Sequence, residues 1–167
     1  MKKTLILFLA GLTSLIVVDT KVCDAQKFQK PDQIASYILR FDHVATNIRD
    51  LKQTADWYNN VFGFRVLHKW NTTWMIGNSA MKIGLFQRPT AKKIDSLDNT
   101  IAITHFAFLT TKSGFKKIQQ LLKAKHIPFD APEDTGIAYS IFIYDPDGHQ
   151  IEVTTYYKQL PDNTAKS

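Results

Sequence analysis

The sequence has little cysteine: Cys23 is the only one in 167 residues. It also lacks any uncharged run as long as the roughly 20 residues that span a bilayer, because the run from Thr4 to Val18 is shorter. A hydrophobic content of 44% excludes wholesale disorder. The length and composition therefore predict one folded domain.

The first 25 residues have the features of a secretory signal peptide. Lys2-Lys3 precede an apolar run from Leu5 to Val18, and Ala25 is a small residue suited to a cleavage site. We expect cleavage near Ala25-Gln26 and an exported protein, periplasmic or extracellular; a membrane anchor is the alternative. Cleavage would remove Cys23, so disulfides and thiolate ligands would be excluded, and any metal would be held by His and carboxylate side chains.

Positive charge exceeds negative charge only modestly. The formal net charge is +6, and the lysines are scattered along the chain instead of forming one aromatic-studded face. This distribution and the expected export argue against a nucleic-acid partner. We expect a small-molecule partner, and no membrane association after the leader is removed.

Residues 38–157 are predicted to form two modules, 38–88 and 101–157, after a flexible arm at 26–37 and before a loose tail at 158–167. In the first module, Asp50 and Gln53 form a capping-box-like pattern before a helix that ends at Gly63. The predicted strands of both modules are 40–48, 64–70, 72–76, 80–87, 101–109, 139–144 and 149–156, with a poorly formed strand between Pro128 and Gly136. A second helix is expected after Ser113-Gly114.

The last two strands are joined by Asp145-Pro146-Asp147-Gly148, which suits a type I turn. Beyond this turn, side chains alternate between the two faces of the strand. Glu152 therefore lies on the opposite face from Ile151 and Val153. A carboxylate among polar neighbours on one face is typical of a lined cavity.

The two modules repeat the same order of strand, helix and three strands. Asp42-His43-Val44-Ala45 aligns with Thr104-His105-Phe106-Ala107, and Ile83-Gly84-Leu85 aligns with Ile151-Glu152-Val153. The two histidines are thus predicted to occupy equivalent positions, on the sheet face opposite the one covered by a helix.

His43, His105 and Glu152 together predict a metal site with three protein ligands. Imidazole and carboxylate suit Zn(II), Ni(II), Mn(II) or Fe(II), and three ligands leave coordination positions for water or substrate. Gly84 stands where the repeat would place a fourth ligand. Gln87 is a weaker candidate for that role, because its strand parity is opposite to that of Gly84.

The chain resembles the vicinal oxygen chelate superfamily, which includes glyoxalase I, fosfomycin-modifying enzymes, extradiol dioxygenases and bleomycin-binding proteins. The resemblance rests on D-H-V-A, A-D-W-Y-N-N-V-F-G-F-R-V, T-H-F-A-F and D-P-D-G-H-Q-I-E-V, and covers nearly all of 38–157. It implies an α+β fold in which two βαβββ modules form a cupped mixed sheet with helices outside. It also implies the ligands His43, His105 and Glu152, and a homodimer that can pair modules between chains.

Two functions remain open from the sequence. The first is a metal-dependent lyase or isomerase acting on a small substrate chelated through two oxygens, with Glu152 as a catalytic carboxylate. The second is a metal-free protein that sequesters a small molecule, as bleomycin-resistance proteins do. The expected substrate contacts are Asn47, Arg65, Trp74, Ser140 and Phe142.

Overall fold

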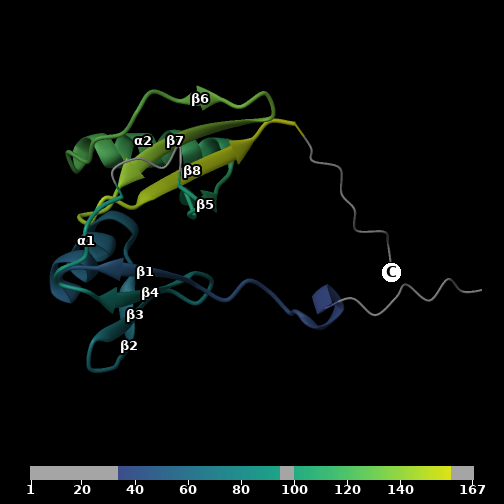
Figure 1. The fold of residues 1–167 in the computed structure, drawn as a ribbon. Helices are drawn as coiled ribbons and strands as arrows, with labels where there is room; N and C mark the ends of the chain where they lie inside the picture. The colour runs from purple at the N-terminus through teal and green to yellow at the C-terminus, as the bar shows by residue number, and fades with distance from the viewer. Residues whose placement is uncertain (1–33, 95–99, 159–167) are drawn as a thin grey trace, which may run out of the picture. The chain divides into compact units, whose positions relative to one another are not determined.

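The computed structural model describes residues 34–94 and 100–158 (Figure 1). The predicted leader, most of the arm and nearly all of the tail lie outside these residues. The chain divides into two units, residues 1–39 and 40–167. The described part of the first unit contains a short 3-10 helix, η1 (Ile34–Tyr37). No helix in the described ranges is long and apolar enough to cross a membrane.

The first module has the predicted order of elements. Its helix α1 (Leu51–Phe62) begins after Asp50, whose side chain accepts a hydrogen bond from the backbone N–H of Gln53, and ends at Gly63 in the left-handed conformation. Its strands are β1 (Val44–Ile48), β2 (Arg65–Lys69), β3 (Thr73–Gly77) and β4 (Lys82–Gln87).

The second module repeats this order. Its strands are β5 (His105–Leu109), β6 (Glu133–Asp134), β7 (Ala138–Tyr144) and β8 (Gln150–Tyr156). Its helix α2 (Lys112–Ala124) is capped by Thr111, so it begins before the predicted Ser113-Gly114. The Thr111 side chain accepts from the backbone N–H of Gly114, and this bond fixes the earlier start.

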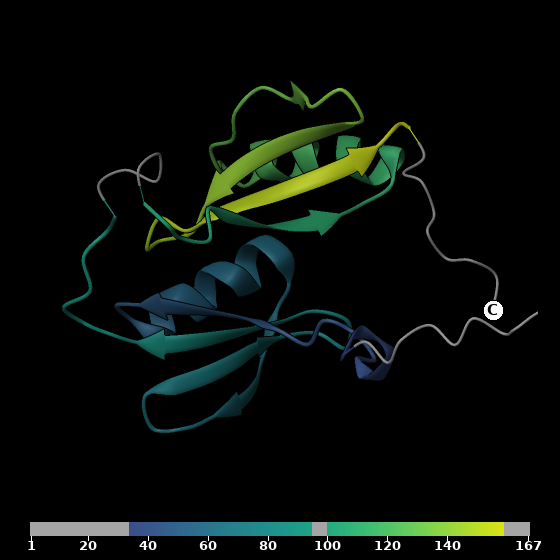
Figure 2. The same cartoon turned by 45° about the vertical axis from the view of Figure 1, so that its right-hand side comes forward.

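Each module forms its own four-stranded mixed sheet, with strand orders β1-β4-β3-β2 and β5-β8-β7-β6. The first strand of each module runs parallel to the last, and the remaining pairs are antiparallel. Figure 2 shows α1 and α2 each lying along one face of their own sheet. The α+β class and the two βαβββ modules predicted from the sequence are confirmed.

Strand β1 begins later than predicted, at Val44 instead of Arg40, and β5 begins at His105 instead of Ile101. The partner strand sets this limit for β1. Val44 pairs with Ile83, and β4 begins only one residue earlier, at Lys82, so β4 offers no pairing partner for residues before His43.

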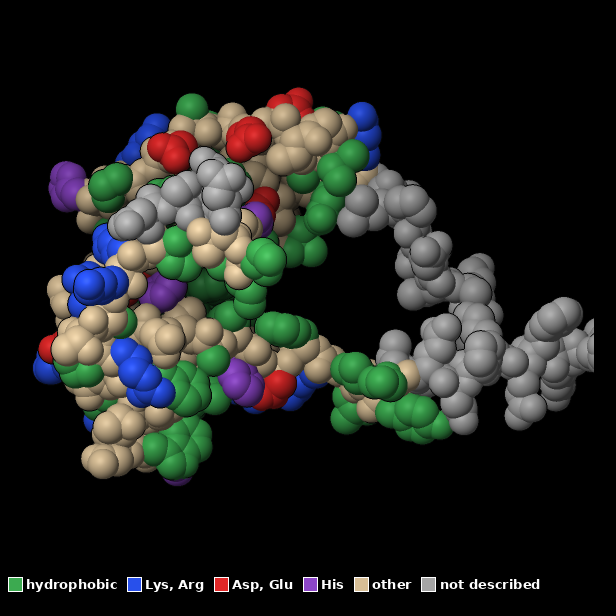
Figure 3. Space-filling model, in the orientation of Figure 1, with side chains coloured by type: hydrophobic (Ala, Val, Ile, Leu, Met, Phe, Trp, Pro, Cys, Tyr) green, Lys and Arg blue, Asp and Glu red, His purple; other side chains and the backbone are tan. Residues whose placement is uncertain are grey.

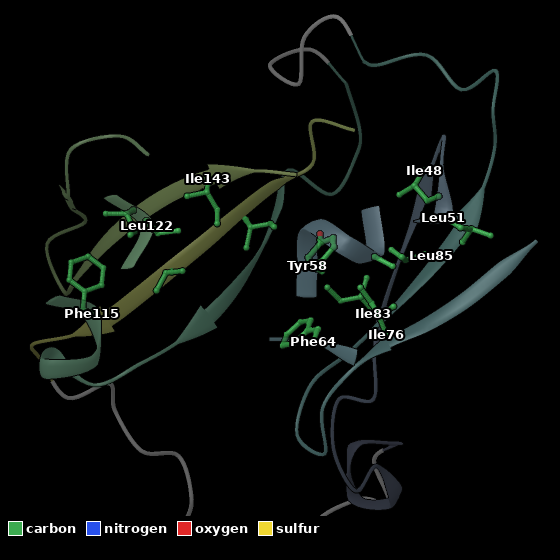
Figure 4. Close-up of a cluster of buried hydrophobic side chains, with 14 residues drawn as sticks. Ile48, Leu51, Tyr58, Phe64, Ile76, Ile83, Leu85, Phe115, Leu122 and Ile143 are labelled. Atoms are coloured by element: carbon green, nitrogen blue, oxygen red, sulfur yellow. The ribbon is translucent and has the colours of Figure 1, made fainter. Parts of the chain in front are cut away.

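Buried aliphatic and aromatic side chains fill the space between each helix and its sheet. Tyr58 and Phe64 lie against Ile76 and Ile83 in the first module, as Figure 4 shows. In the second module, Phe115 and Leu122 of α2 face the sheet that carries Ile143. The spacing of Leu51, Ala55, Tyr58 and Phe62 in the sequence predicts one helical stripe, and this stripe is the core-facing side of α1.

Aromatic contacts connect the two modules. The ring of Phe108, on β5, lies edge-on to Phe62 at 5.2 Å between centroids and to Phe64 at 5.9 Å. Edge-to-face pairs at such distances are favourable beyond the area that they bury. The face of each sheet that meets its helix is therefore apolar. Polar side chains lie on the opposite face, which is named the open face of the sheet.

Candidate functional site

The second module brings together two of the three predicted metal ligands. Ala107 on β5 pairs in register with Glu152 on β8, so His105 and Glu152 lie on the same face of the sheet. Their nearest side-chain atoms, His105 Nε2 and Glu152 Oε2, are 3.0 Å apart. The histidine is exposed and the carboxylate is partly buried.

Ser140, on the neighbouring strand β7, holds the carboxylate in place. Its hydroxyl donates to Glu152 Oε1 and lies 3.0 Å from Thr154 Oγ1. Ser140 was predicted to contact substrate, but only 1% of its surface is exposed. A hydroxyl that is buried and engaged in this way positions Glu152, and the substrate contact expected of Ser140 stays a prediction.

His105 is also held from two sides. Its Nδ1 lies 3.0 Å from the hydroxyl of Thr104, which leaves Nε2 toward Glu152. The ring of Phe142 packs edge-on to the imidazole at 5.8 Å between centroids. Phe142 thus packs beside His105 on this face and restricts the orientation of the imidazole, whereas its contact with substrate stays a prediction.

His105 and Glu152 together suit a divalent metal. Metal-ligand distances near 2.0–2.2 Å place neighbouring donor atoms roughly 3 Å apart, which is the separation of His105 Nε2 and Glu152 Oε2. The second ring nitrogen and the second carboxylate oxygen are both hydrogen-bonded, as is usual for side chains that bind metals. His105 and Glu152 could therefore provide two of the ligands.

The third predicted ligand, His43, is placed differently. Its Nδ1 is 2.8 Å from Asp42 Oδ2, and the other oxygen of Asp42 accepts a hydrogen bond from Lys82. The Lys82 ammonium and His43 hold the pKa of Asp42 below its usual range. Within residues 34–94 and 100–158, no three His, Cys, Asp or Glu side chains form a group that could hold a metal ion.

The strand register supports the predicted equivalence of Gly84 and Glu152. Ala45 pairs with Gly84 as Ala107 pairs with Glu152. A Cβ atom added to Gly84 would lie 3.8 Å from His43 Cδ2 and 3.3 Å from the ring of Phe86. Gly84 therefore lies directly beside His43, at a position from which a longer side chain could approach that histidine.

Gln87, the weaker candidate for a fourth ligand, has another partner. Its side-chain nitrogen lies 3.5 Å from the backbone oxygen of Arg49. This contact turns it toward the loop before α1, as its opposite strand parity predicted.

The remaining predicted contacts divide between the two faces of the first sheet. Asn47 is exposed and shares strand parity with Ala45, and Arg65 pairs with Gly77, so both lie on the face of His43. Trp74 pairs with Leu85 and lies on the other face, where it lines a hollow with α1. Trp74 therefore does not share a sheet face with His43, because its place in β3 has the parity of the core residues.

A buried polar network at the turn after β7 was not predicted. The side chain of Asp145 accepts hydrogen bonds from the backbone N–H groups of Asp147 and His149 at 3.0 and 2.9 Å, and from the Tyr58 hydroxyl at 3.2 Å. Burial and Asp145 raise the pKa of Tyr58 far above its usual value. The signal in the sequence was a tyrosine in a helical core stripe, since a buried hydroxyl needs a partner.

The same turn is tied to the start of α1. Arg49 Nε donates to Asp147 Oδ1 at 2.9 Å, and the Thr54 hydroxyl donates to Asp147 Oδ2 at 3.0 Å. Burial alone would raise the pKa of Asp147, but these hydrogen bonds outweigh it and the pKa lies below its usual value. The hydrogen bond to Asp145 raises the pKa of His149 against the opposing effect of burial. These contacts position the hairpin that carries Glu152.

Paired βαβββ modules with polar residues on the sheet faces opposite the helices define a class of small-ligand and metal-binding proteins. The family model described as "Glyoxalase/Bleomycin resistance protein/Dioxygenase superfamily" matches residues 40–153. The chain belongs to this superfamily.

Individual proteins that are similar to this chain support its membership of the superfamily. The chain is 30% identical over 128 residues to "Metallothiol transferase FosB" of Lysinibacillus sphaericus, covering 71% of this chain and 89% of the relative. It is 29% identical to "Virulence protein STM3117" of Salmonella typhimurium, covering 78% and 93%. Among solved structures, the glyoxalase family protein from Enterococcus faecalis has a TM-score of 0.63 at 19% identity, covering 71% of this chain and 98% of that one. This structural likeness concerns the fold.

Proposed function

We propose that this protein is a divalent-metal-dependent enzyme, a lyase or isomerase acting on a small substrate that offers two neighbouring oxygens. The observation that carries the proposal is the 3.0 Å separation of His105 Nε2 and Glu152 Oε2 on one open sheet face. The similarity to a protein named as a metallothiol transferase supports the metal-dependent class.

His105 and Glu152 would hold the metal, which would supply Lewis-acid stabilisation of the negative charge that develops on a substrate oxygen. Ser140 keeps Glu152 Oε1 engaged, so Oε2 is the oxygen directed toward His105. In this proposal Glu152 also serves as the catalytic carboxylate that accepts a substrate proton. Phe142 would form an apolar wall beside the substrate.

We propose that the third ligand, His43, is supplied by a second copy of the chain. Two observations support this. His43 is exposed on the open face of its own sheet, and no group of three ligands forms among the described residues of one chain. A dimer that pairs the first module of one copy with the second module of the other would join His43 to His105 and Glu152.

A metal-free ligand-binding protein is the second candidate. The observation behind it is the 2.8 Å contact of His43 Nδ1 with Asp42 Oδ2, which holds this histidine in place whether or not its Nε2 binds a metal. The two candidates differ in what loss of the His105 side chain would do. In the enzyme it would remove bound metal, whereas in the metal-free protein it would change only how the small molecule fits.

Metal content distinguishes them. We expect about one divalent ion per chain in gently purified protein by elemental analysis, and its loss in His105→Ala and Glu152→Ala. His68→Ala is the matched control, because His68 is exposed and contacts Trp70 instead of a carboxylate. Protein with little metal, and with an unchanged His105→Ala variant, would exclude the enzyme.

The shared site can be tested by mixing variants. His43→Ala and Glu152→Ala should each lose metal, whereas co-refolding the two should recover about a quarter of the sites, because each mixed dimer keeps one complete set of ligands. A site built within one chain would recover none. Recovery of metal also shows that both variants fold.

Export is proposed separately, from the residues before Gln26. A bacterial host should secrete the chain and remove about 25 residues, as intact-mass measurement of the secreted protein would show. Retention of Lys2-Lys3 in a membrane fraction would favour the anchor instead.

A further inference from the structure

The open face of the first sheet carries a basic hollow that the proposed metal chemistry does not use. It has a volume of about 470 Å³. Its lining comes from β2, β3, β4, their adjoining turns and the segment before β1, and is made up of Arg40, Gly63, Arg65, Leu67, Gly77, Asn78, Ser79 and Lys82. No acidic residue is among them. A volume in this range is typical of sites for small organic ligands.

The charges of this basic hollow are only partly balanced. Lys82 is paired with Asp42. In the described part of the chain, neither Arg40 nor Arg65 forms an ion pair with an acidic side chain. Two unpaired guanidinium groups beside one hollow favour an anion, because each presents a planar fork of donors that matches carboxylate and phosphate oxygens.

Two glycines are part of the lining of the basic hollow. Gly77 has a φ of 145°, and a Cβ there would lie 2.0 Å from the backbone oxygen of Met81. Gly77 is thus required by the turn, and it leaves backbone instead of a side chain on the lining. Gly63, which ends α1 in the left-handed conformation, has no atom within 4 Å of an added Cβ, so the space beside it is free.

A second hollow, on the other face of the same sheet, differs from the basic hollow in how its charges are paired. It has a volume of about 430 Å³ and includes Lys52, Asp56, Lys69 and Trp74 in its lining. There, Lys52 is paired with Asp56 at 2.6 Å, and Lys69 lies over the ring of Trp74 at 4.0 Å. Lys52 and Lys69 thus already have partners there. Arg65 lines both hollows, but only the basic hollow adds a second arginine without an acidic partner, Arg40.

We propose that the basic hollow is a binding site for a small organic anion, whose carboxylate or phosphate group pairs with Arg65 and Arg40. Lys82 adds positive charge at the β4 side of the site. Lys82 and His43 are joined through Asp42, so an anion bound there lies on the sheet face that carries His43. The site is formed by the first module and does not require the metal.

The test uses the full chain treated with a chelator, so that failure of metal binding cannot affect the result. Inorganic phosphate, acetate and the neutral acetamide are titrated by calorimetry and by NMR shifts of the arginine Nε–H groups. We expect saturable binding of an anion and none of acetamide. Tighter binding of phosphate than of acetate would assign a phosphate group, and the reverse order would assign a carboxylate.

Arg65→Gln and Arg40→Gln should each weaken anion binding at least about tenfold. Arg88→Gln is the control: it removes the same charge from an exposed arginine that donates to the Gln87 carbonyl oxygen, lies over the ring of Phe86 and does not line the basic hollow. Thermal unfolding of each variant confirms that it is folded. Equal weakening in all three variants, or binding that does not saturate, would overturn the proposal.

Discussion

The two modules have the same backbone plan but different side chains on their open faces. Ala45 pairs with Gly84 in the first module, and Ala107 pairs with Glu152 in the second. The second module therefore has a histidine and a carboxylate in contact, whereas the first has a histidine beside a glycine. The repeat thus keeps the histidine in both modules but the carboxylate in the second module alone.

The turns that join the last two strands differ in the same way. In the first module, Asn78 Oδ1 accepts from the backbone N–H groups of Ala80 and Met81, and the turn is exposed. In the second, Asp145 makes the equivalent bonds, but it is buried and also bound to Tyr58 and His149. One turn serves only its hairpin, and the other connects the hairpin that carries Glu152 to α1.

The largest effect is expected from Asp145→Ala. The substitution would leave the buried Tyr58 hydroxyl and two backbone N–H groups without their acceptor, and should lower the free energy of unfolding by about 3–5 kcal/mol. Urea denaturation monitored by circular dichroism measures it. Asn78→Ala is the matched change in the other turn and should cost about 1 kcal/mol, because water can replace the lost bonds there. Equal losses would show that the two turns do not differ in this way.

The network around Asp145 also shows where prediction from sequence ended. Strand parity correctly placed His105 with Glu152, because alternation and a repeat are local properties of the chain. One partner of Asp145, the Tyr58 hydroxyl, lies 87 positions away in the sequence. No spacing rule joins residues so far apart. Trp74, an expected substrate contact, lies on the sheet face opposite His43, and a mixed polar and apolar strand does not reveal this parity.

Ser140→Ala should have the next largest effect. It removes the hydroxyl that holds Glu152, and loss of such a supporting hydrogen bond typically weakens metal affinity by 10- to 100-fold. Competition with a chromogenic chelator measures the affinity. Ser113→Ala removes an exposed hydroxyl on α2 and should leave it unchanged. Retained affinity in Ser140→Ala would mean that the Ser140 contact does not position the ligand.

Gly84→Glu tests whether the first module can be made to resemble the second. A carboxylate there would extend from a position beside His43, after a shift of the Phe86 ring. If the proposed site includes His43, the added ligand should tighten metal binding by a few-fold to about tenfold. Gly84→Gln, which keeps the size but not the charge, should not. Tightening by both would indicate a packing effect instead of a fourth ligand.

The smallest expected effect is a pH dependence of stability that arises from Asp145 and His149 in the turn after β7. Because Asp145 raises the pKa of His149, the folded chain binds that proton more tightly than the unfolded chain does. The stabilisation is thus fully present below the usual histidine pKa of about 6.5 and is lost as pH rises through the raised value. The pKa of Asp147 is lowered in the folded chain, so its contribution to stability is present above the usual aspartate pKa and is lost as pH falls through the lowered value. This loss occurs only at acidic pH.

His149→Gln should therefore destabilise the protein more at about pH 5.5 than at about pH 8.5, with a difference on the order of 1 kcal/mol or less, since His149 is 30% exposed. Thermal unfolding across this range measures it. His68→Gln, which lacks a carboxylate partner, should change stability equally at both pH values. A His149→Gln effect that is independent of pH would mean that the contact with Asp145 contributes through hydrogen bonding alone, and that the turn of the second module carries no ionic advantage over the turn at Asn78.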